Sequence, residues 1–115
     1  MIRRNKAPKR TTAIRKRRTV ERRGPAGIPA NEWRNRAYRG WLYDKPCAAC
    51  SDRRGSDPAH SEHNGMSSKG RDSSCLPLCR YHHLEQHALG MTAFQTRYNL
   101  DMREAAKFWW ERFNS

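Results

Sequence analysis

Apolar side chains recur at helical spacing over about residues 31–44. Side chains four residues apart in this segment share one helix face, and arginines occupy much of the opposite face. Lys45-Pro46 ends the predicted helix, because the residue before a proline is pushed out of the α region. The apolar stripe consists of Trp33, Ala37, Tyr38, Trp41 and Leu42.

Two further helices are predicted in the second half of the chain. One runs over residues 80–89, and Gly90 is placed to cap its C-terminal end. The other runs over residues 101–113 and begins where the Asp101 carboxylate can accept the backbone N–H of Glu104. The apolar face of this last helix is made of Met102, Ala105, Ala106, Trp109, Trp110 and Phe113.

Between these helices the pattern is extended and short. Residues 57–63 suit a strand, and residues 76–78 form a second extended piece in which Pro77 argues against a central sheet position. A Gly- and Ser-rich loop, residues 64–74, separates the two. The pattern therefore predicts a small α+β domain over residues 31–115, with a core over 44–90 and flanking helices at about 31–44 and 101–113.

Charge is concentrated at the N-terminus. The 115 residues include 24 Lys and Arg against 11 Asp and Glu, a net charge of +13, and 11 of the cations lie in residues 1–23. We expect residues 1–30 to be a disordered basic arm with a Gly/Pro linker, and a nucleic acid, DNA first, to be its partner. The cations assigned to nucleic-acid binding are Arg3, Arg4, Lys6, Lys9, Arg10, Arg15, Lys16, Arg17, Arg18, Lys69 and Arg71.

Membranes and export are not indicated by the sequence. No apolar run approaches the ~20 residues of a membrane span. No apolar secretory stretch follows the basic N-terminus. The sequence therefore favours a cytoplasmic protein without a membrane partner, associated with the nucleoid in a bacterial or phage setting. It does not specify an oligomeric state.

Four cysteines in a reducing compartment indicate metal ligands before disulfides. Cys47 and Cys50 form a Cys-x-x-Cys pair. After 28 intervening residues, Cys79 and His82 form a Cys-x-x-His pair. Three thiolates and one imidazole are a tetrahedral donor set typical of structural zinc. Two alternatives stay open: disulfide bonds, and replacement of His82 by Cys75 as the fourth ligand.

Three further histidines suggest chemistry beside the predicted zinc site. His83 and His87 lie four residues apart on the predicted helix, so their side chains share one face and can bind a second cation. His60 lies on the predicted strand, where an imidazole can accept a proton from water at neutral pH. A strand histidine facing this helix would suit metal-assisted hydrolysis of a phosphodiester. The alternative is that the helix histidines are simply solvated.

The segments PCAAC, DPAHSEHNGMSSKGRD and LPLCRYHHLEQHALGMTAF resemble, in order and spacing, the small HNH (ββα-metal) nucleases of phages and prophages, which include recombination-associated nucleases. The resemblance covers about residues 38–98. It implies a zinc-stapled ββα-metal fold and a metal-dependent endonuclease acting on DNA, with RNA as an open alternative. It also implies His60 as general base, Asp72 as its orienting or metal-assisting partner, and a catalytic Mg²⁺, Mn²⁺ or Zn²⁺ on His83 and His87.

Two positions depart from the HNH pattern. The residue before the base is Ala59, where many family members carry a metal-binding Asp or His, so Asp57, Asp72, water or a substrate phosphate would complete the ligands. The central residue is Asp72 rather than asparagine, and a loop-capping role for its carboxylate is an alternative. Rival functions are a non-catalytic zinc module that binds DNA or RNA, and an RNA-scaffold protein, which explains the charge but not the histidines.

Overall fold

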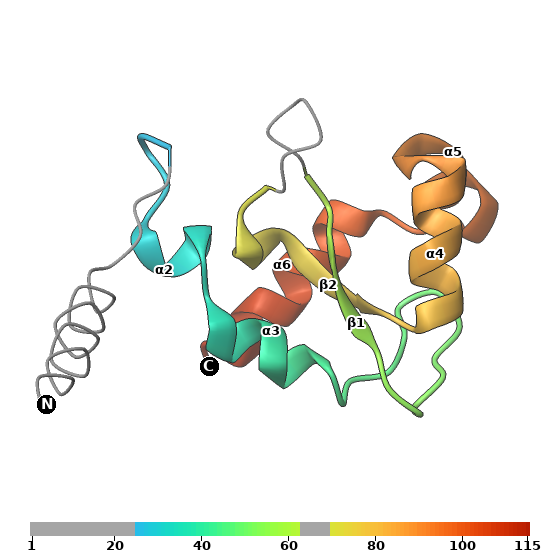
Figure 1. Cartoon of the computed structure of the whole chain (residues 1–115), viewed down its shortest axis with the longest axis horizontal. Helices are drawn as coiled ribbons and strands as arrows, with labels where there is room; N and C mark the ends of the chain where they lie inside the picture. Colours follow the sequence, from blue (N-terminus) through green and yellow to red (C-terminus); the bar gives the residue numbers. More distant parts are fainter. Residues whose placement is uncertain (1–24, 63–69) are drawn as a thin grey trace, which may run out of the picture.

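A computed structural model describes residues 25–62 and 70–115 (Figure 1). It is an α+β structure, as predicted. Residues 1–24 of the predicted arm and linker, and most of the loop between the strands, lie outside the described residues. In the described part, no helix is both long and apolar enough to span a bilayer. The elements in chain order are α2 (Ala30–Trp33), α3 (Arg36–Leu42), β1 (Asp57–His60), the 3₁₀ turn η2 (Asp72–Ser74), β2 (Cys75–Leu78), α4 (Arg80–Leu89), α5 (Met91–Tyr98) and α6 (Met102–Phe113).

The two strands pair antiparallel and form a two-stranded sheet. Asp57 lies opposite Leu78 at one end, and His60 lies opposite Cys75 at the other. Every residue of β2 is buried, although Pro77 is among them. Proline is tolerated because each strand has one paired edge only. The first strand ends at His60, earlier than the predicted strand over residues 57–63, of which His63 lies outside the described residues. The Ser61 N–H still donates to the Ser74 carbonyl at 2.9 Å just beyond the paired residues.

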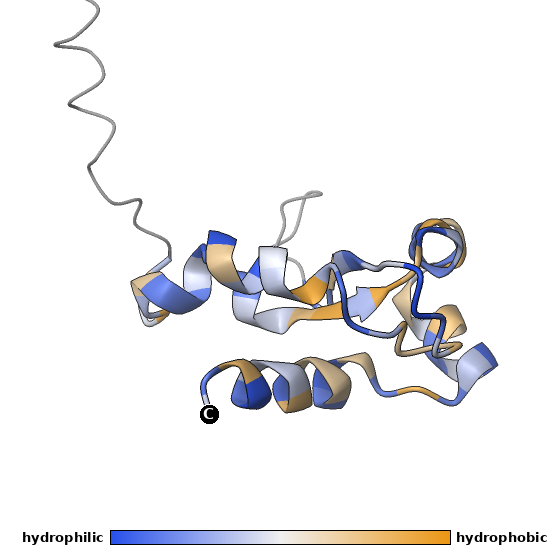
Figure 2. Ribbon diagram, turned by 90° about the horizontal axis from the view of Figure 1, so that it is seen from below, coloured by the Kyte–Doolittle hydropathy of each residue, from blue (hydrophilic) through white to orange (hydrophobic). Residues whose placement is uncertain are grey.

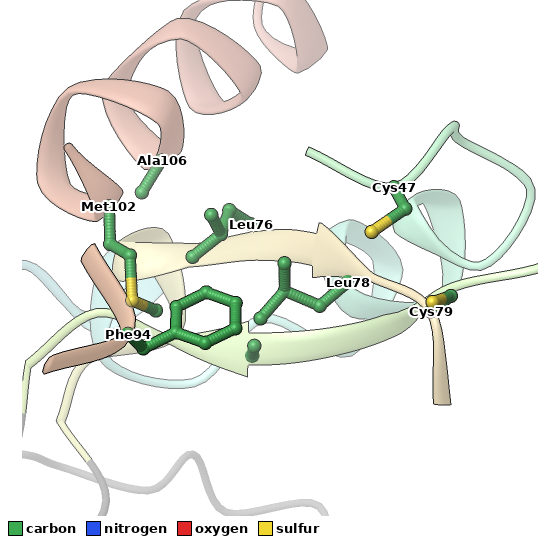
Figure 3. Close-up of a cluster of buried hydrophobic side chains, with 8 residues drawn as sticks. Cys47, Leu76, Leu78, Cys79, Phe94, Met102 and Ala106 are labelled. Atoms are coloured by element: carbon green, nitrogen blue, oxygen red, sulfur yellow. The ribbon is translucent and has the colours of Figure 1, made fainter. Parts of the chain in front are cut away.

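One face of the sheet packs against α5 and α6. Leu76 and Leu78 of β2, with Ala59 of β1, contact side chains from these helices in a buried cluster. Figure 3 shows the two leucines directed toward Phe94 and Met102, with the cysteines at the far end of β2. The cluster is completed by Phe94, Met102, Ala106, Cys47 and Cys79.

The other face of β2 packs against α3. Tyr38 and Leu42 are fully buried beside Cys75, and the Tyr38 hydroxyl donates to the Cys75 carbonyl at 2.8 Å. Trp110 meets the Tyr38 ring edge-on at a centroid separation of 4.9 Å, so the C-terminal half of α6 closes this cluster. In Figure 2, α6 forms a separate layer alongside the strands. The apolar face predicted for the last helix is thus the one that packs.

The first predicted helix is two short helices. The chain leaves helical geometry after Trp33, and Asn35 caps α3 by accepting the backbone N–H of Tyr38 at 2.9 Å. The break moves Trp33 off the predicted stripe and leaves Ala37 exposed. A cap is favoured here because the Asn35 backbone N–H also donates to the buried Asp72 carboxylate at 2.8 Å.

Helix α4 has the predicted bounds and ends at Gly90, whose φ of 90° suits glycine. The Asp101 carboxylate accepts the Glu104 N–H at 3.1 Å, which confirms the predicted cap of α6. Gly70 is the first described residue after the loop between the strands, and its backbone lies close to that of Glu62. A Cβ on Gly70 would lie 2.4 Å from the Glu62 carbonyl oxygen, so this close approach requires glycine.

Candidate functional site

Four side chains converge where β2 meets α4. Cys47 and Cys50 come from the turn that follows α3, Cys79 precedes α4, and His82 lies in its first turn. One ligand atom from each lies within 4.8 Å of the other three. The structure thus brings together the two pairs predicted from the sequence.

The distances within this Cys/His cluster suit a tetrahedral ion. A zinc ion with bonds of ~2.3 Å to sulfur and ~2.0 Å to nitrogen places its ligand atoms roughly 3.3–3.8 Å apart. The Cys50 and Cys79 sulfurs are 4.0 Å apart, and His82 Nδ1 lies 3.2 Å from Cys79 Sγ and 3.9 Å from Cys47 Sγ. No cysteine is disulfide-bonded, and all four lie in the described part of the chain. The cluster can therefore hold a metal ion.

The thiols of the cluster influence one another. Burial opposes ionisation of Cys47, but backbone N–H groups, including that of Ala49 at 3.4 Å from Sγ, outweigh it and lower the pKa of Cys47. Partial removal from water and the neighbouring Cys47 thiolate raise the pKa of Cys50 to about 11. A second thiolate is unfavourable beside the first, and a divalent cation would remove that penalty.

Aromatic rings from α4 and α5 hold the His82 ring in place. The rings of Tyr81 and Tyr98 both meet it edge-on at centroid separations of 4.9 Å, and Phe94 lies 6.4 Å away. The Tyr98 hydroxyl donates to Glu85 on α4, which ties the two helices together. Nδ1 of His82 therefore points at the sulfurs. His82, and not Cys75, is the fourth member of this cluster, because Cys75 lies apart from it and close to His60 and Asp72.

A second group, the Asp57 cluster, consists of Asp57 on β1 with Arg80, His83 and His87 on α4. His83 Nδ1 lies 3.1 Å from Asp57 Oδ2, and His83 Nε2 lies 3.2 Å from His87 Nε2. Arg80 approaches the same carboxylate oxygen at 3.6 Å. Asp57 is thus a hydrogen-bond partner of His83, and its sequence-based assignment as a metal ligand stays a prediction.

A third group, the Asp72 cluster, surrounds a carboxylate that is 2% exposed. His60 Nε2 donates to Asp72 Oδ1 at 3.1 Å, and Arg39 Nε donates to Oδ2 at 3.0 Å. The Arg34 guanidinium lies 3.7 Å from Oδ1, and the Asn35 N–H reaches Oδ2. Burial opposes ionisation, but these hydrogen bonds and the charge of Arg39 outweigh it and lower the pKa of Asp72. Asp72 is therefore more than a loop cap.

The Asp57 and Asp72 clusters lie on opposite faces of the sheet. Successive strand side chains point to opposite faces, so Asp57 and His60, three residues apart, diverge. Asp57 meets His83 on α4, whereas His60 meets Asp72, which is bonded to Asn35 and Arg39. The sequence-based expectation that His60 faces the helix histidines is wrong for this structure, because the strand register turns it toward α3.

The remaining predicted contacts are mostly untested by the structure. Arg71 is held internally, with Nε at 3.0 Å from Glu62 and a terminal nitrogen at 3.5 Å from Glu32. Lys69 and the nine cations assigned to the basic arm lie outside the described residues.

Comparison with known proteins places the chain in a family. Residues 28–112 match the family described as "Protein of unknown function (DUF968)". The chain belongs to this family. The DUF968 match begins before α2, ends one residue short of the end of α6 and includes all three polar clusters.

One relative is a protein of Escherichia coli (strain K12) described as uncharacterized protein YdfU. It is 34% identical over 79 residues, which are 66% of this chain and 22% of that protein. The chain thus spans about a fifth of its relative's length. No solved structure matches the chain.

Sequence reasoning missed the partners of Asp72. Arg34 and Arg39 were assigned to the polar face of a helix, and Asn35 to its interior. The available signal was Asn35 itself, because asparagine is a weak helix former and a strong cap. The long-range ion pairs had no local signal, since 33 residues separate Arg39 from Asp72.

Proposed function

We propose that this domain is a metal-dependent endonuclease of the HNH type that hydrolyses phosphodiester bonds in DNA. A zinc ion on Cys47, Cys50, Cys79 and His82 would hold the fold together. A divalent cation on His83 and His87 would serve the reaction, with His60 as general base. The resemblance of the motifs to HNH nucleases motivates the proposal, and the geometry of the polar clusters supports parts of it.

The zinc assignment rests on donor chemistry. Three sulfurs select a soft or borderline ion over Mg²⁺ or Ca²⁺, and four protein donors leave no open position for substrate. The ion would therefore be structural.

The observation that carries the catalytic proposal is the pairing of His83 with His87. Two nitrogens bound to one cation at ~2.1 Å lie roughly 3.0–3.4 Å apart, and the two Nε2 atoms are 3.2 Å apart. The Asp57 carboxylate on His83 Nδ1 would fix the tautomer that presents Nε2, a role typical of carboxylates beside metal-binding histidines. When bound, the cation would neutralise charge that develops on the scissile phosphate.

The base assignment is supported by the His60–Asp72 pair. A carboxylate that accepts from one ring nitrogen leaves the other as the proton acceptor and stabilises the imidazolium that forms. In the proposal, His60 accepts a proton from the attacking water. His60 and His83 point to opposite faces of the sheet. The described arrangement therefore does not bring the base and the metal ligands to one phosphodiester, and the two assignments need separate tests.

Nicking of supercoiled plasmid tests the metal assignment. Zinc-loaded protein with added Mg²⁺ or Mn²⁺ should nick DNA, and His83→Ala should lower the rate at least ~100-fold, since metal stabilisation of the transition state is lost. Leu84→Ala, one residue further along α4 and exposed, is the control and should cleave normally. Zinc content and melting temperature should be unchanged in both. A His83→Ala variant with full activity would overturn the metal assignment.

His60→Gln tests the base assignment separately. Loss of a general base lowers a rate by ~10²–10⁴, and this variant should do so while keeping a near-normal melting temperature, because the glutamine amide can still donate to Asp72. If cleavage stays normal while His83→Ala is inactive, the base assignment fails and the metal assignment stands. A pH–rate profile that loses its ascending limb in His60→Gln would support the base.

A second candidate function, a non-catalytic nucleic-acid-binding module, is favoured by the separation of His60 from His83. A protein that binds DNA but cuts neither DNA nor RNA with Mg²⁺, Mn²⁺, Co²⁺, Ni²⁺ or Zn²⁺ would establish this alternative. Deletion of residues 1–23 then measures how much the basic arm contributes to nucleic-acid binding. Binding should weaken for every sequence alike, and the slope of log K against log salt should fall by ~0.9 per lost phosphate contact.

A further inference from the structure

A pocket of about 350 Å³ lies between α6 and described residues at the two ends of the connection between the strands, residues 61–62 and 71–74, with Glu32 of α2 beside them. It is separate from the Cys/His cluster and from the Asp57 cluster. Its wall on α6 consists of Arg103, Ala106, Lys107 and Trp110. Its opposite wall includes Glu32, Glu62, Arg71 and Ser73. The volume is at the lower end of the range for small-ligand sites, which is ~300–1,000 Å³.

The cations of the pocket fall into two kinds. Arg71 is neutralised by Glu32 and Glu62. Arg103 and Lys107 have no acidic partner among the described residues. They lie four residues apart on α6, where like charges repel and destabilise a helix slightly. An anion between them would relieve that repulsion.

The remaining groups suit a nucleobase. Trp110 is half-buried and offers part of its indole to the pocket, and indole faces stack on any base. The Glu32 carboxylate accepts a hydrogen bond from the Ser73 hydroxyl at 3.1 Å and keeps lone pairs for a base amino group. An aromatic wall, an acceptor and two uncompensated cations within one small cavity match a base joined to a phosphate.

We propose that this pocket binds one nucleoside monophosphate unit, with its phosphate on Arg103 and Lys107 and its base beside Trp110 and Glu32. The unit is either a free nucleotide or an unstacked nucleotide of a single strand. The second source rests on the proposed function, since it makes the pocket a further contact with the nucleic-acid substrate. Binding itself requires no cleavage.

Chemical-shift mapping by NMR on the zinc-loaded full chain locates the ligand regardless of the basic arm. Addition of dAMP should shift the Trp110 indole N–H and the backbone amides of Arg103, Lys107 and Ser73. A short single strand should shift the same signals. If the strand shifts them and dAMP does not, the unit is bound only within a strand. If inorganic phosphate reproduces every shift, or if none of these signals moves, the proposal is overturned.

Paired charge removals on α6 provide the affinity test. Arg103→Ala with Lys107→Ala should weaken dAMP or strand binding about tenfold or more, because both charge-assisted hydrogen bonds are lost. Arg112→Ala, an exposed cation of the same helix outside the pocket, should change affinity less than about twofold. If the double variant and Arg112→Ala weaken binding equally, the proposal that this pocket binds the nucleotide is overturned. Normal affinity for dAMP in a protein that cuts no DNA would leave the pocket standing and defeat the nuclease proposal alone.

Discussion

The Cys/His cluster and the Asp72 cluster hold opposite ends of the same two strands by different means. The Cys/His cluster lies beyond Leu78, and the Asp72 cluster lies beside the His60–Cys75 pair. The Cys/His cluster gathers three thiols and an imidazole and contains no cation of its own, whereas the Asp72 cluster surrounds one carboxylate with Arg39, Arg34 and His60.

The difference is one of charge balance. Partial removal from water and the neighbouring Cys47 thiolate raise the pKa of Cys50. Several thiolates in one cluster also repel each other, so the Cys/His cluster is stable as a charged group only with an added cation. The Asp72 carboxylate already has its counter-charges, and its pKa is lowered. We therefore expect one end of the domain to depend on metal and the other to fold without it.

The largest expected effect is loss of a donor from the Cys/His cluster. Cys79→Ser, or a strong chelator, should unfold the domain, because zinc binding contributes ~10–16 kcal/mol of apparent folding free energy in small zinc peptides. Circular dichroism and elemental analysis measure folding and zinc content together. Cys75→Ala is the matched control, since that cysteine lies outside the cluster, and it should keep one zinc per chain. A Cys79→Ser protein that is folded without zinc would contradict the expectation that this end of the domain depends on metal.

The next effect is loss of the buried carboxylate. Asp72→Asn should lower the free energy of unfolding by about 2–4 kcal/mol, below the usual cost of breaking a buried ion pair because Arg39 is partly exposed and can be rehydrated. Denaturant unfolding measures the loss. Zinc content should stay at the wild-type value. A simultaneous loss of zinc would show that the two ends are coupled.

The pH dependence of the stability lost in Asp72→Asn tests whether the Asp72 carboxyl group is stabilised in its ionised form. A carboxyl group whose folded pKa is lowered contributes stability above its unfolded pKa of ~3.9 and loses it as the pH falls through the folded value. The stability difference between wild type and Asp72→Asn should therefore be constant from pH 7 to 5. It should shrink only below about pH 4, as followed by denaturant unfolding. A difference that shrinks already between pH 7 and 5 would mean that the Asp72 pKa is raised.

The smallest effect concerns the cap beside the Asp72 cluster. Asn35→Ala removes the acceptor for the Tyr38 N–H but keeps the backbone N–H that donates to Asp72. The free energy of unfolding should fall by about 1 kcal/mol, the usual cost of a lost helix cap. Asp101→Ala at the start of α6 is the parallel cap variant and should cost a similar amount in thermal unfolding. A much larger loss in Asn35→Ala would place this asparagine within the Asp72 cluster energetically.

Local features of the fold were predictable from the sequence. The bounds of α4 follow from a helical segment that ends at glycine, and the start of α6 follows from an aspartate three residues before a glutamate. The Cys/His cluster was predictable for a related reason. Each of its two pairs is a local motif, and only one long-range contact has to form to bring them together.

The sequence by itself determined which residues could carry charge, coordinate a metal or pack as a helix face. Tertiary structure alone decided that His60 turns toward Asp72 and Asp57 toward His83, because one residue of strand register moves a side chain to the other face of the sheet. It also decided that Arg34 and Arg39 balance a buried carboxylate 33 or more residues away. Ion pairs of that range depend on how helices pack against the strands, which no local pattern of residues specifies.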